Sequence, residues 1–201
     1  MSATFEQPAV TGESRDGLMA RLRRLEDKER LRSLMIRGWR ALDARDWETW
    51  IACWTDHALM EFGPWPPIRG REEILRVVSE AEAPYDSMQH HILNMEFDVV
   101  GDTATGIGYM WFVAVPEPHL RDRPYAMGGP YAWEFVRTAD GWRLSRQRLG
   151  VSWETGEDPT RAFSEQSLPS DHEQSRAMEN KFRQNPAAAG PGGSVKKGVA
   201  L

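Results

Sequence analysis

Two adjacent histidines, His90 and His91, stand in the run "DSMQHHILNMEF", whose other residues are typical of a β-strand. Histidine is the side chain best matched to proton transfer near neutral pH, and it usually needs a carboxylate that holds its tautomer. Neighbouring residues of a strand point to opposite faces of the sheet, so at most one of the two can serve a given pocket. We therefore ask which histidine would act as a base and which acid would orient it.

The alternation along this strand separates an apolar face from a mixed face. His91 falls on the apolar face, whereas the mixed face would carry His90, Ile92, Asn94 and Glu96. A few polar groups among apolar walls are typical of a ligand pocket. The pattern therefore favours His90 as the functional histidine, with Asn94 as a residue that orients the substrate.

The acid best placed to meet this histidine is Asp43, at the C-terminal end of the first predicted helix and beside Trp39 and Leu42. A carboxylate is mildly unfavourable at a helix C-terminus, and that cost makes sense if the carboxylate pairs with a proton-bearing imidazole. A solvated helix end explains Asp43 equally well, so the residues alone leave both interpretations open. If the pair forms, Trp39 becomes a wall of the pocket beside it.

Proton abstraction also calls for a group that stabilises a developing oxyanion. Arg146 and Arg148 share a strand face with apolar residues in "WRLSRQR". Arg146 is favoured over Arg148, and it fits either an oxyanion holder or a structural ion pair. Tyr109 alternates with Trp111 on one face of the long middle strand, and its hydroxyl fits either a donor to the oxyanion or a satisfied group in the core.

Aromatic residues are abundant, with nine tryptophans in 201 residues. Flat aromatic walls suit a flat apolar ligand as well as they suit packing. Tyr131 and Trp133 fit either a pocket wall or the sheet core, and Trp111 is a further candidate for contact with a substrate. The composition leans toward an aromatic substrate.

Composition and charge argue against several other classes of protein. The net charge of −5 gives no basic face for nucleic acid, and the single cysteine, Cys53, supplies neither an internal disulfide nor a zinc set. No basic region followed by an apolar run opens the sequence, and no window is apolar enough to span a membrane. We therefore expect a cytoplasmic protein with no nucleic acid or membrane partner and with neither a metal nor another cofactor.

Hydrophobic periodicity predicts the elements that must position these residues. Apolar residues at helical spacing predict a first helix from Leu18 to about Asp43 and a third over 71–83, and Asp46 can cap a short second helix. A strand is expected over 57–62, and further strands over 90–100, 103–115, 130–138 and 141–153. Helices followed by an antiparallel meander indicate an α+β domain with the helices on one face of the sheet.

The prediction for the whole chain is one domain with two appended segments. Residues 1–14 are expected to form a flexible N-terminal arm, and residues 15–156 the domain. Residues 157–201 are expected to form a C-terminal extension, with a short helix and then a mobile tail, because their composition cannot bury enough apolar surface to fold alone.

Five short segments, in this order, carry a resemblance to a known family. They are "ALDARDW", "IRGREEI", "QHHILN", "GDTATG" and "DGWRLSR". Over about residues 18 to 156 the sequence resembles the SnoaL-like branch of the nuclear transport factor 2 (NTF2) superfamily, which includes scytalone dehydratase and bile acid 7α-dehydratase. The resemblance implies a cone-shaped α+β fold, a curved and mostly antiparallel sheet wrapped around three N-terminal helices. It also implies that Asp43 pairs with His90, and it matches Arg146 to a pocket arginine.

The sequence departs from these dehydratases at the groups that polarise the substrate. Leu42 and Phe62 stand where scytalone dehydratase has tyrosines, so Phe62 is expected to form pocket wall instead. The base and its carboxylate therefore match the family, whereas the electrophilic groups do not.

These patterns together predict a cofactor-independent lyase. His90, oriented by Asp43, would take a proton from a hydrophobic cyclic or aromatic substrate, while Arg146 or Tyr109 stabilises the oxyanion. Loss of water is the first choice, and retro-aldol loss of formaldehyde from a lignin-derived diaryl compound is the variant. A non-catalytic ligand-binding or assembly subunit, and an isomerase or cyclase, are the alternatives, because a fold alone does not confer activity. The broad aromatic sheet face predicts a homodimer or homotrimer.

Overall fold

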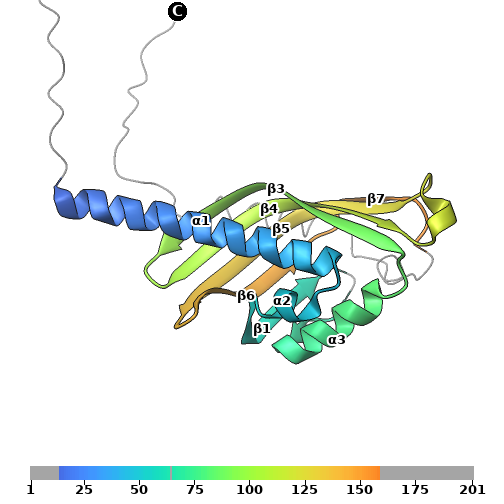
Figure 1. Cartoon of the computed structure of the whole chain (residues 1–201), viewed down its shortest axis with the longest axis horizontal. Helices are drawn as coiled ribbons and strands as arrows, with labels where there is room; N and C mark the ends of the chain where they lie inside the picture. Colours follow the sequence, from blue (N-terminus) through green and yellow to red (C-terminus); the bar gives the residue numbers. More distant parts are fainter. Residues whose placement is uncertain (1–13, 64, 159–201) are drawn as a thin grey trace, which may run out of the picture.

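The computed structural model describes residues 14–63 and 65–158 (Figure 1). The predicted arm over 1–14 and the predicted extension over 157–201 lie almost wholly outside the described residues, so those boundaries remain predictions. In chain order the elements are α1 (Arg15–Asp43), α2 (Trp47–Ile51), β1 (Trp54–Phe62), β2 (Ile68–Arg69), α3 (Arg71–Glu82), β3 (Ser87–Val100), β4 (Thr103–Val115), a 3-10 turn η1 (Pro118–Leu120), β5 (Tyr125–Thr138), β6 (Gly141–Leu149) and β7 (Trp153–Thr155).

The strands form one curved, unclosed sheet in the order β2-β1-β6-β5-β4-β3, and β7 pairs with β5. β1 runs parallel to β6, and the other pairs are antiparallel. Figure 1 shows α1 lying across the sheet and α2 and α3 gathered beside β1. The prediction of an α+β fold, with a curved and mostly antiparallel sheet around three N-terminal helices, is confirmed. Among the described residues, no helix is both long and apolar enough to cross a membrane.

The ends of α1 are set by local hydrogen bonds. The side chain of Ser14 accepts a hydrogen bond from the backbone N–H of Gly17 at 3.1 Å, which caps the N-terminus. After Asp43 the chain leaves the helix at Arg45, whose φ of 56° is left-handed. Asp46 then accepts a hydrogen bond from the N–H of Thr49 and caps α2, as the sequence predicts. This sharp turn leaves Asp43 as the last helical residue, facing β3.

A β-bulge in β3 decides which of its side chains face the helices. Within 93–96 the register shifts, so that two residues of β3 oppose one of β4. Asn94 lies at this shift with a φ of 52°, a conformation that asparagine tolerates better than most residues. His90 faces the helices before the bulge, whereas Met95 and Phe97 face them after it.

A second bulge changes which side chains of β6 face the helices. Ser145 is an extra residue there, because its two neighbours pair with consecutive residues of β5. Leu144 faces the helices before the bulge, and Gln147 and Leu149 face them after it. Arg146 therefore lies on the outer face of the sheet.

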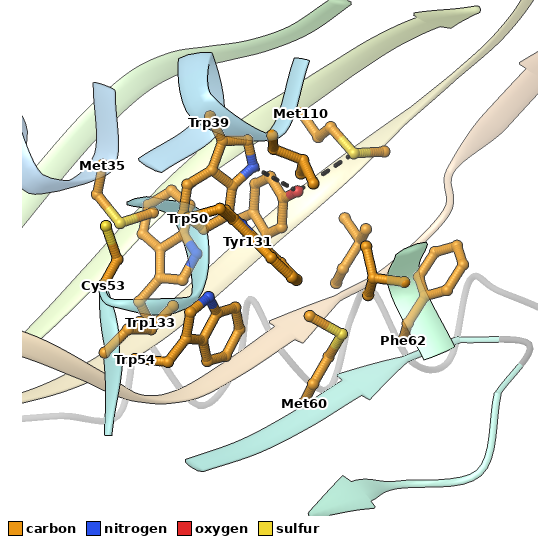
Figure 2. Packing of buried hydrophobic residues seen from close by; sticks show 14 of the residues in the cluster. Met35, Trp39, Trp50, Cys53, Trp54, Met60, Phe62, Met110, Tyr131 and Trp133 are labelled. Carbon is orange, nitrogen blue, oxygen red and sulfur yellow. Dashed lines mark hydrogen bonds between the residues drawn. The ribbon is translucent and has the colours of Figure 1, made fainter. Parts of the chain in front are cut away.

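The core between helices and sheet is rich in aromatic and sulfur-containing side chains. Trp50 and Trp54 are each 1% exposed, and Trp133 is 2% exposed. Figure 2 shows these indoles with Cys53 and Met35 on the helix side of the sheet. Large aromatic side chains dominate hydrophobic burial, so this cluster fixes the distance between α1 and the strands.

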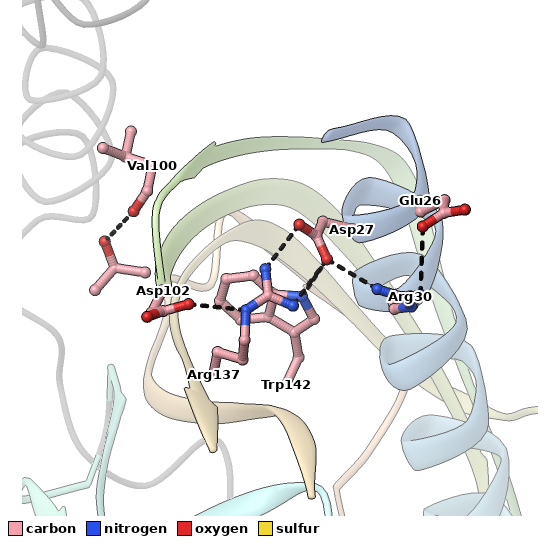
Figure 3. A network of polar contacts seen from close by, with 8 residues as sticks. Glu26, Asp27, Arg30, Val100, Asp102, Arg137 and Trp142 are labelled. Carbon is pink, nitrogen blue, oxygen red and sulfur yellow. Dashed lines mark hydrogen bonds and ion pairs between the residues drawn. The ribbon is translucent and has the colours of Figure 1, made fainter. Parts of the chain in front are cut away.

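An ion-pair network fastens α1 to the far end of the sheet (Figure 3). Asp27 accepts hydrogen bonds from two guanidinium nitrogens of Arg137, at 2.9 and 2.7 Å, and from Trp142 Nε1 at 3.2 Å. The hydrogen bonds from Arg137 outweigh the opposing effect of burial and hold the pKa of Asp27 below its usual range. The guanidinium also lies 4.3 Å from the centre of the Trp142 ring. This network holds the middle of α1 in a fixed position, and Asp43 ends the same helix.

Between β6 and β7 the chain crosses tightly over β5. Gly150 donates its N–H to the carbonyl of Pro130 at 3.0 Å, and Ser152 donates to that of Gly128 at 2.8 Å. A Cβ at Gly129 would lie only 1.9 Å from the carbonyl oxygen of Gly150. Only glycine fits this crossing, which breaks the strand predicted over 141–153 into two.

Candidate active site

Asp43 and His90 are in direct contact. Asp43 Oδ1 lies 2.7 Å from His90 Nδ1, and the same carboxylate accepts the backbone N–H of His90 at 2.9 and 3.1 Å. An ionised carboxylate only accepts hydrogen bonds, so Nδ1 carries the ring hydrogen. In the neutral imidazole, Nε2 then keeps its lone pair and is the nitrogen that can take a proton.

His90 forms part of the wall of a largely apolar pocket. The space is about 460 Å³, including its open mouth. Its apolar walls include Trp39, Phe62, Trp65 and Phe112, and the ring of Phe112 lies 4.6 Å from that of His90. Trp39 and Phe62, both predicted as substrate contacts, thus line the same pocket as His90.

A buried carboxyl that the sequence analysis did not select completes this wall. Glu82, the last residue of α3, is 4% exposed, and its Oε1 lies 3.6 Å from His90 Nε2. Burial raises the pKa of Glu82 well above its usual range, and the charge of Asp43 raises it further, against a smaller opposing effect of Arg45. The carboxyl therefore keeps its proton to a higher pH than an ordinary glutamate does.

A sequence signal for Glu82 was present. Ile74, Val78 and Glu82 are spaced four residues apart, and they are the buried residues of α3. A glutamate on the apolar stripe of an amphipathic helix departs from the usual pattern of solvated charges. That position on the buried stripe, and not the number of charges in "SEAEA", is the sequence signal that could have selected Glu82 as a candidate.

Tyr131 lines the pocket, whereas Trp133 lies in the core. Trp39 Nε1 donates a hydrogen bond to the Tyr131 hydroxyl at 3.3 Å, and that hydroxyl donates to Met110 Sδ at 3.4 Å (Figure 2). Burial raises the pKa of Tyr131, so its hydroxyl stays protonated. The sequence did not decide between pocket wall and sheet core for these two residues. In the structure Tyr131 lines the pocket and Trp133 is buried in the core.

Gln147 is a second pocket residue that the sequence analysis missed. Trp133 Nε1 donates to Gln147 Oε1 at 3.2 Å, and an indole N–H only donates, so the amide oxygen must face Trp133. The NH₂ group has no hydrogen-bond partner among the described residues. Gln147 can therefore donate to an oxygen atom of a bound molecule.

The arginines of β6 lie outside the pocket, so the predicted placement of Arg146 was wrong. Arg146 and Arg148 each donate from Nε to Glu61 at 2.8 Å on the outer face. Against the effect of burial, these hydrogen bonds hold the pKa of Glu61 below its usual range. The physical reason for the error is the bulge at Ser145, which reverses the alternation assumed for "WRLSRQR".

The predicted placement of Tyr109, Trp111 and Asn94 in the pocket was also wrong. Tyr109 and Trp111 are each 50% exposed on the outer face of the sheet. Asn94 is exposed at the β3 bulge, which removes it from the face that carries His90. Within residues 14–63 and 65–158, no group of three or more His, Cys, Asp and Glu side chains could hold a metal ion.

A curved sheet covered by helices, with a His–Asp pair in an apolar pocket, is the arrangement that the resemblance to the NTF2 superfamily implies. The model of the SnoaL-like domain family matches residues 23–148. The chain belongs to this family, and the predicted membership is confirmed. No curated protein matches the chain significantly.

Solved structures share the fold. An NTF2-like protein with a cystatin-like fold from Novosphingobium aromaticivorans is 25% identical, with 76% of this chain and 98% of that chain covered and a TM-score of 0.58. A protein of N. aromaticivorans DSM 12444, provisionally described as a scytalone dehydratase, is 16% identical over 72% and 93%, with a TM-score of 0.59. Hexachlorocyclohexane dehydrochlorinase LinA-type3 from Novosphingobium barchaimii LL02 is 17% identical over 71% and 93%, with a TM-score of 0.56.

Proposed function

We propose that the protein is a lyase in which His90, oriented by Asp43, is the general base. The observation that supports this proposal is the orientation of the His90 ring. Nδ1 is held by a carboxylate at 2.7 Å, while Nε2 is directed to Glu82, which lines the same apolar pocket as His90. A base in this position acts on a molecule in the pocket, and general base catalysis is typically worth about 10²- to 10⁴-fold.

The substrate is a small hydrophobic molecule, cyclic or aromatic. The walls next to His90 are rings and thioethers, and few polar groups interrupt them. Such a lining favours a flat apolar body, with one oxygen-bearing end directed to the polar groups. Gln147, and not Arg146 or Tyr109, is the donor that would stabilise the developing oxyanion, because its NH₂ group has no hydrogen-bond partner in the part of the chain that the structure describes.

Elimination of water is the reaction we favour. The provisional scytalone dehydratase and the dehydrochlorinase are named for elimination reactions, and both share this fold. Retro-aldol cleavage with loss of formaldehyde is the variant, because the same base can deprotonate a hydroxyl group. Neither reaction needs a metal or another cofactor, since a base and a hydrogen-bond donor suffice.

Turnover of a defined panel tests the proposal. Purified protein, dialysed against a chelator, is incubated with aryl β-hydroxy ketones, hydroxylated sterols and diaryl diols, beside the variants His90→Gln and Asp43→Asn. His91→Gln is the matched control, because it makes the same change one residue away on the other face. We expect product from the wild type and the control, and a loss of at least about 10²-fold in the other two variants.

Product mass separates the two reactions, since loss of water and loss of formaldehyde differ in mass. Activity that survives both substitutions at the pair would refute the role of His90. Binding of panel compounds without any turnover would favour the non-catalytic ligand-binding interpretation.

A further inference from the structure

We propose that Glu82 is the general acid of this pocket, which protonates the leaving group while His90 removes a proton from the substrate. The inference rests on the lyase function proposed above and adds to it a second proton-transfer group. It also narrows the substrate class to molecules whose leaving group needs a proton, such as β-hydroxy ketones.

The position of the carboxyl supports this role. Glu82 lines the same pocket as His90, and its Oε1 lies 3.6 Å from Nε2. This separation is too long for a direct hydrogen bond, so the two groups do not saturate each other. Glu82 Oε2 is buried and has no hydrogen-bond partner among the described residues. The two groups therefore face a common space from which each can reach a different atom of one substrate.

The surroundings of Glu82 favour its protonated form. Asp43 and Arg45 face it from the end of α1, His90 from β3 and Tyr131 from β5. Burial and the negative charge of Asp43 disfavour a second carboxylate here, and both raise the pKa of Glu82. Arg45 opposes this shift, but its guanidinium donates a hydrogen bond to a backbone carbonyl instead of to this carboxyl.

A structural role alone explains Glu82 poorly. It continues the buried stripe of Ile74 and Val78, where an apolar side chain would pack without any polar group to satisfy. A buried carboxyl with an unpartnered oxygen costs folding free energy. Such a cost is typical of functional sites, where groups are placed for chemistry and not for stability.

All proton transfers of the elimination take place between the substrate, His90 and Glu82. His90 Nε2 bonds to the substrate proton as the C–H bond breaks, and the electron pair of that bond forms the new C=C bond. The C–O bond breaks, and the leaving hydroxyl takes the proton of Glu82 and departs as water. The imidazolium then passes its proton to the Glu82 carboxylate across the short gap, which restores both groups without any co-reactant.

A comparison of two leaving groups tests this assignment. An aryl β-hydroxy ketone and its β-chloro analogue give the same conjugated enone, which is followed by absorbance, but chloride leaves without a proton. We expect Glu82→Gln to lose at least about 10²-fold in kcat/KM with the hydroxy ketone. With the chloro analogue the loss should be at least about 10-fold smaller, whereas His90→Gln should lose activity with both. Glu80→Gln, the same change on an exposed residue of α3, is the matched control.

The outcomes separate the two proposals. Equal losses with both leaving groups in Glu82→Gln would assign Glu82 a structural role and overturn the inference alone. Wild-type turnover of the hydroxy ketone by this variant would do the same. No turnover of either compound by the wild type would overturn the proposed function, and the role of Glu82 with it.

Infrared spectroscopy supplies a readout that needs no substrate. The wild type at neutral pH should show the carbonyl stretch of a protonated carboxylic acid, and this band should be missing from Glu82→Gln and present in Glu80→Gln. A wild-type spectrum without the band would mean that the carboxyl is ionised, and would overturn the assignment.

Discussion

Replacement of Glu82 by glutamine should make the stability of the protein less sensitive to rising pH. In the unfolded chain this glutamate loses its proton near its ordinary pKa of 4.5, whereas the folded protein retains the proton because the pKa of Glu82 is raised well above that value. The folded state then binds one more proton than the unfolded state. The free energy of unfolding of the wild type therefore falls by about 1.4 kcal/mol per pH unit from about pH 4.5 up to the raised pKa.

The sign and size of the effect follow from this difference of one proton. Below about pH 4.5 both states are protonated, and the contribution of Glu82 to stability is fully present. Within the interval between pH 4.5 and the raised pKa, each pH unit costs the wild type about 1.4 kcal/mol of stability that the Glu82→Gln variant keeps. For a domain of this size, that slope corresponds to a relative shift in Tm of roughly 3–6 °C per pH unit in this interval.

Thermal unfolding between pH 4 and pH 8 measures this difference. The Tm of Glu82→Gln minus that of the wild type should grow with pH, while the same difference for the exposed Glu80→Gln control should stay nearly constant. Parallel curves for the wild type and Glu82→Gln would refute the argument, since they would mean that Glu82 ionises in the folded protein as it does in the unfolded one.

Three further predictions concern the scaffold. Gly129→Ala should destabilise the protein by at least about 1–3 kcal/mol in urea unfolding, because its Cβ would meet the backbone of Gly150; an unchanged midpoint would count against the tight crossing. Asp27→Asn should cost about 1.5–3 kcal/mol at pH 7 through the lost charge-assisted hydrogen bonds to Arg137. Since the pKa of Asp27 is lowered on folding, that contribution is present above about pH 3.8 and is lost as the pH falls, so the two proteins should converge in acid. We also propose a homodimer or homotrimer through the outer sheet face around Trp111, and a monomer at micromolar concentration in analytical ultracentrifugation would contradict it.

Helical periodicity and strand alternation indicated where Asp43 and His90 lie, but the residues alone left their contact open, and the resemblance to the SnoaL-like family implied it. The position of Asp43 depends on where α1 stops, and that stop is encoded locally by the run of residues after it. The alternation in β3 near His90 is regular up to the bulge, so the facing of this histidine could be predicted as well. Both residues lie where local patterns hold.

The sequence could not predict which sheet face carries the side chains that follow each bulge. A bulge leaves only a weak signal in the sequence, because Ser145 is an ordinary residue in an exposed strand position and one asparagine, Asn94, does not by itself mark a bulge. Once the alternation is reversed, every later residue is assigned to the wrong face, which is how Arg146 replaced Gln147 in the predicted pocket. The prediction for Tyr109 was wrong for another reason: alternation alone does not say which face of a strand is buried.

The bulge at Ser145 gives this fold an evolutionary route that needs no substitution. If β6 were regular from Leu144 onward, Arg146 and Arg148 would enter the pocket and Gln147 would leave it. The wall opposite His90 would then carry positive charge and would select anionic ligands, while Glu61 would lose both of its partners. A shift in where the strand bulges, with the same residues in it, can thus change the charge preference of the pocket, so the positions of the bulges in β3 and β6 are as informative about the ligands of related proteins as the residues in them.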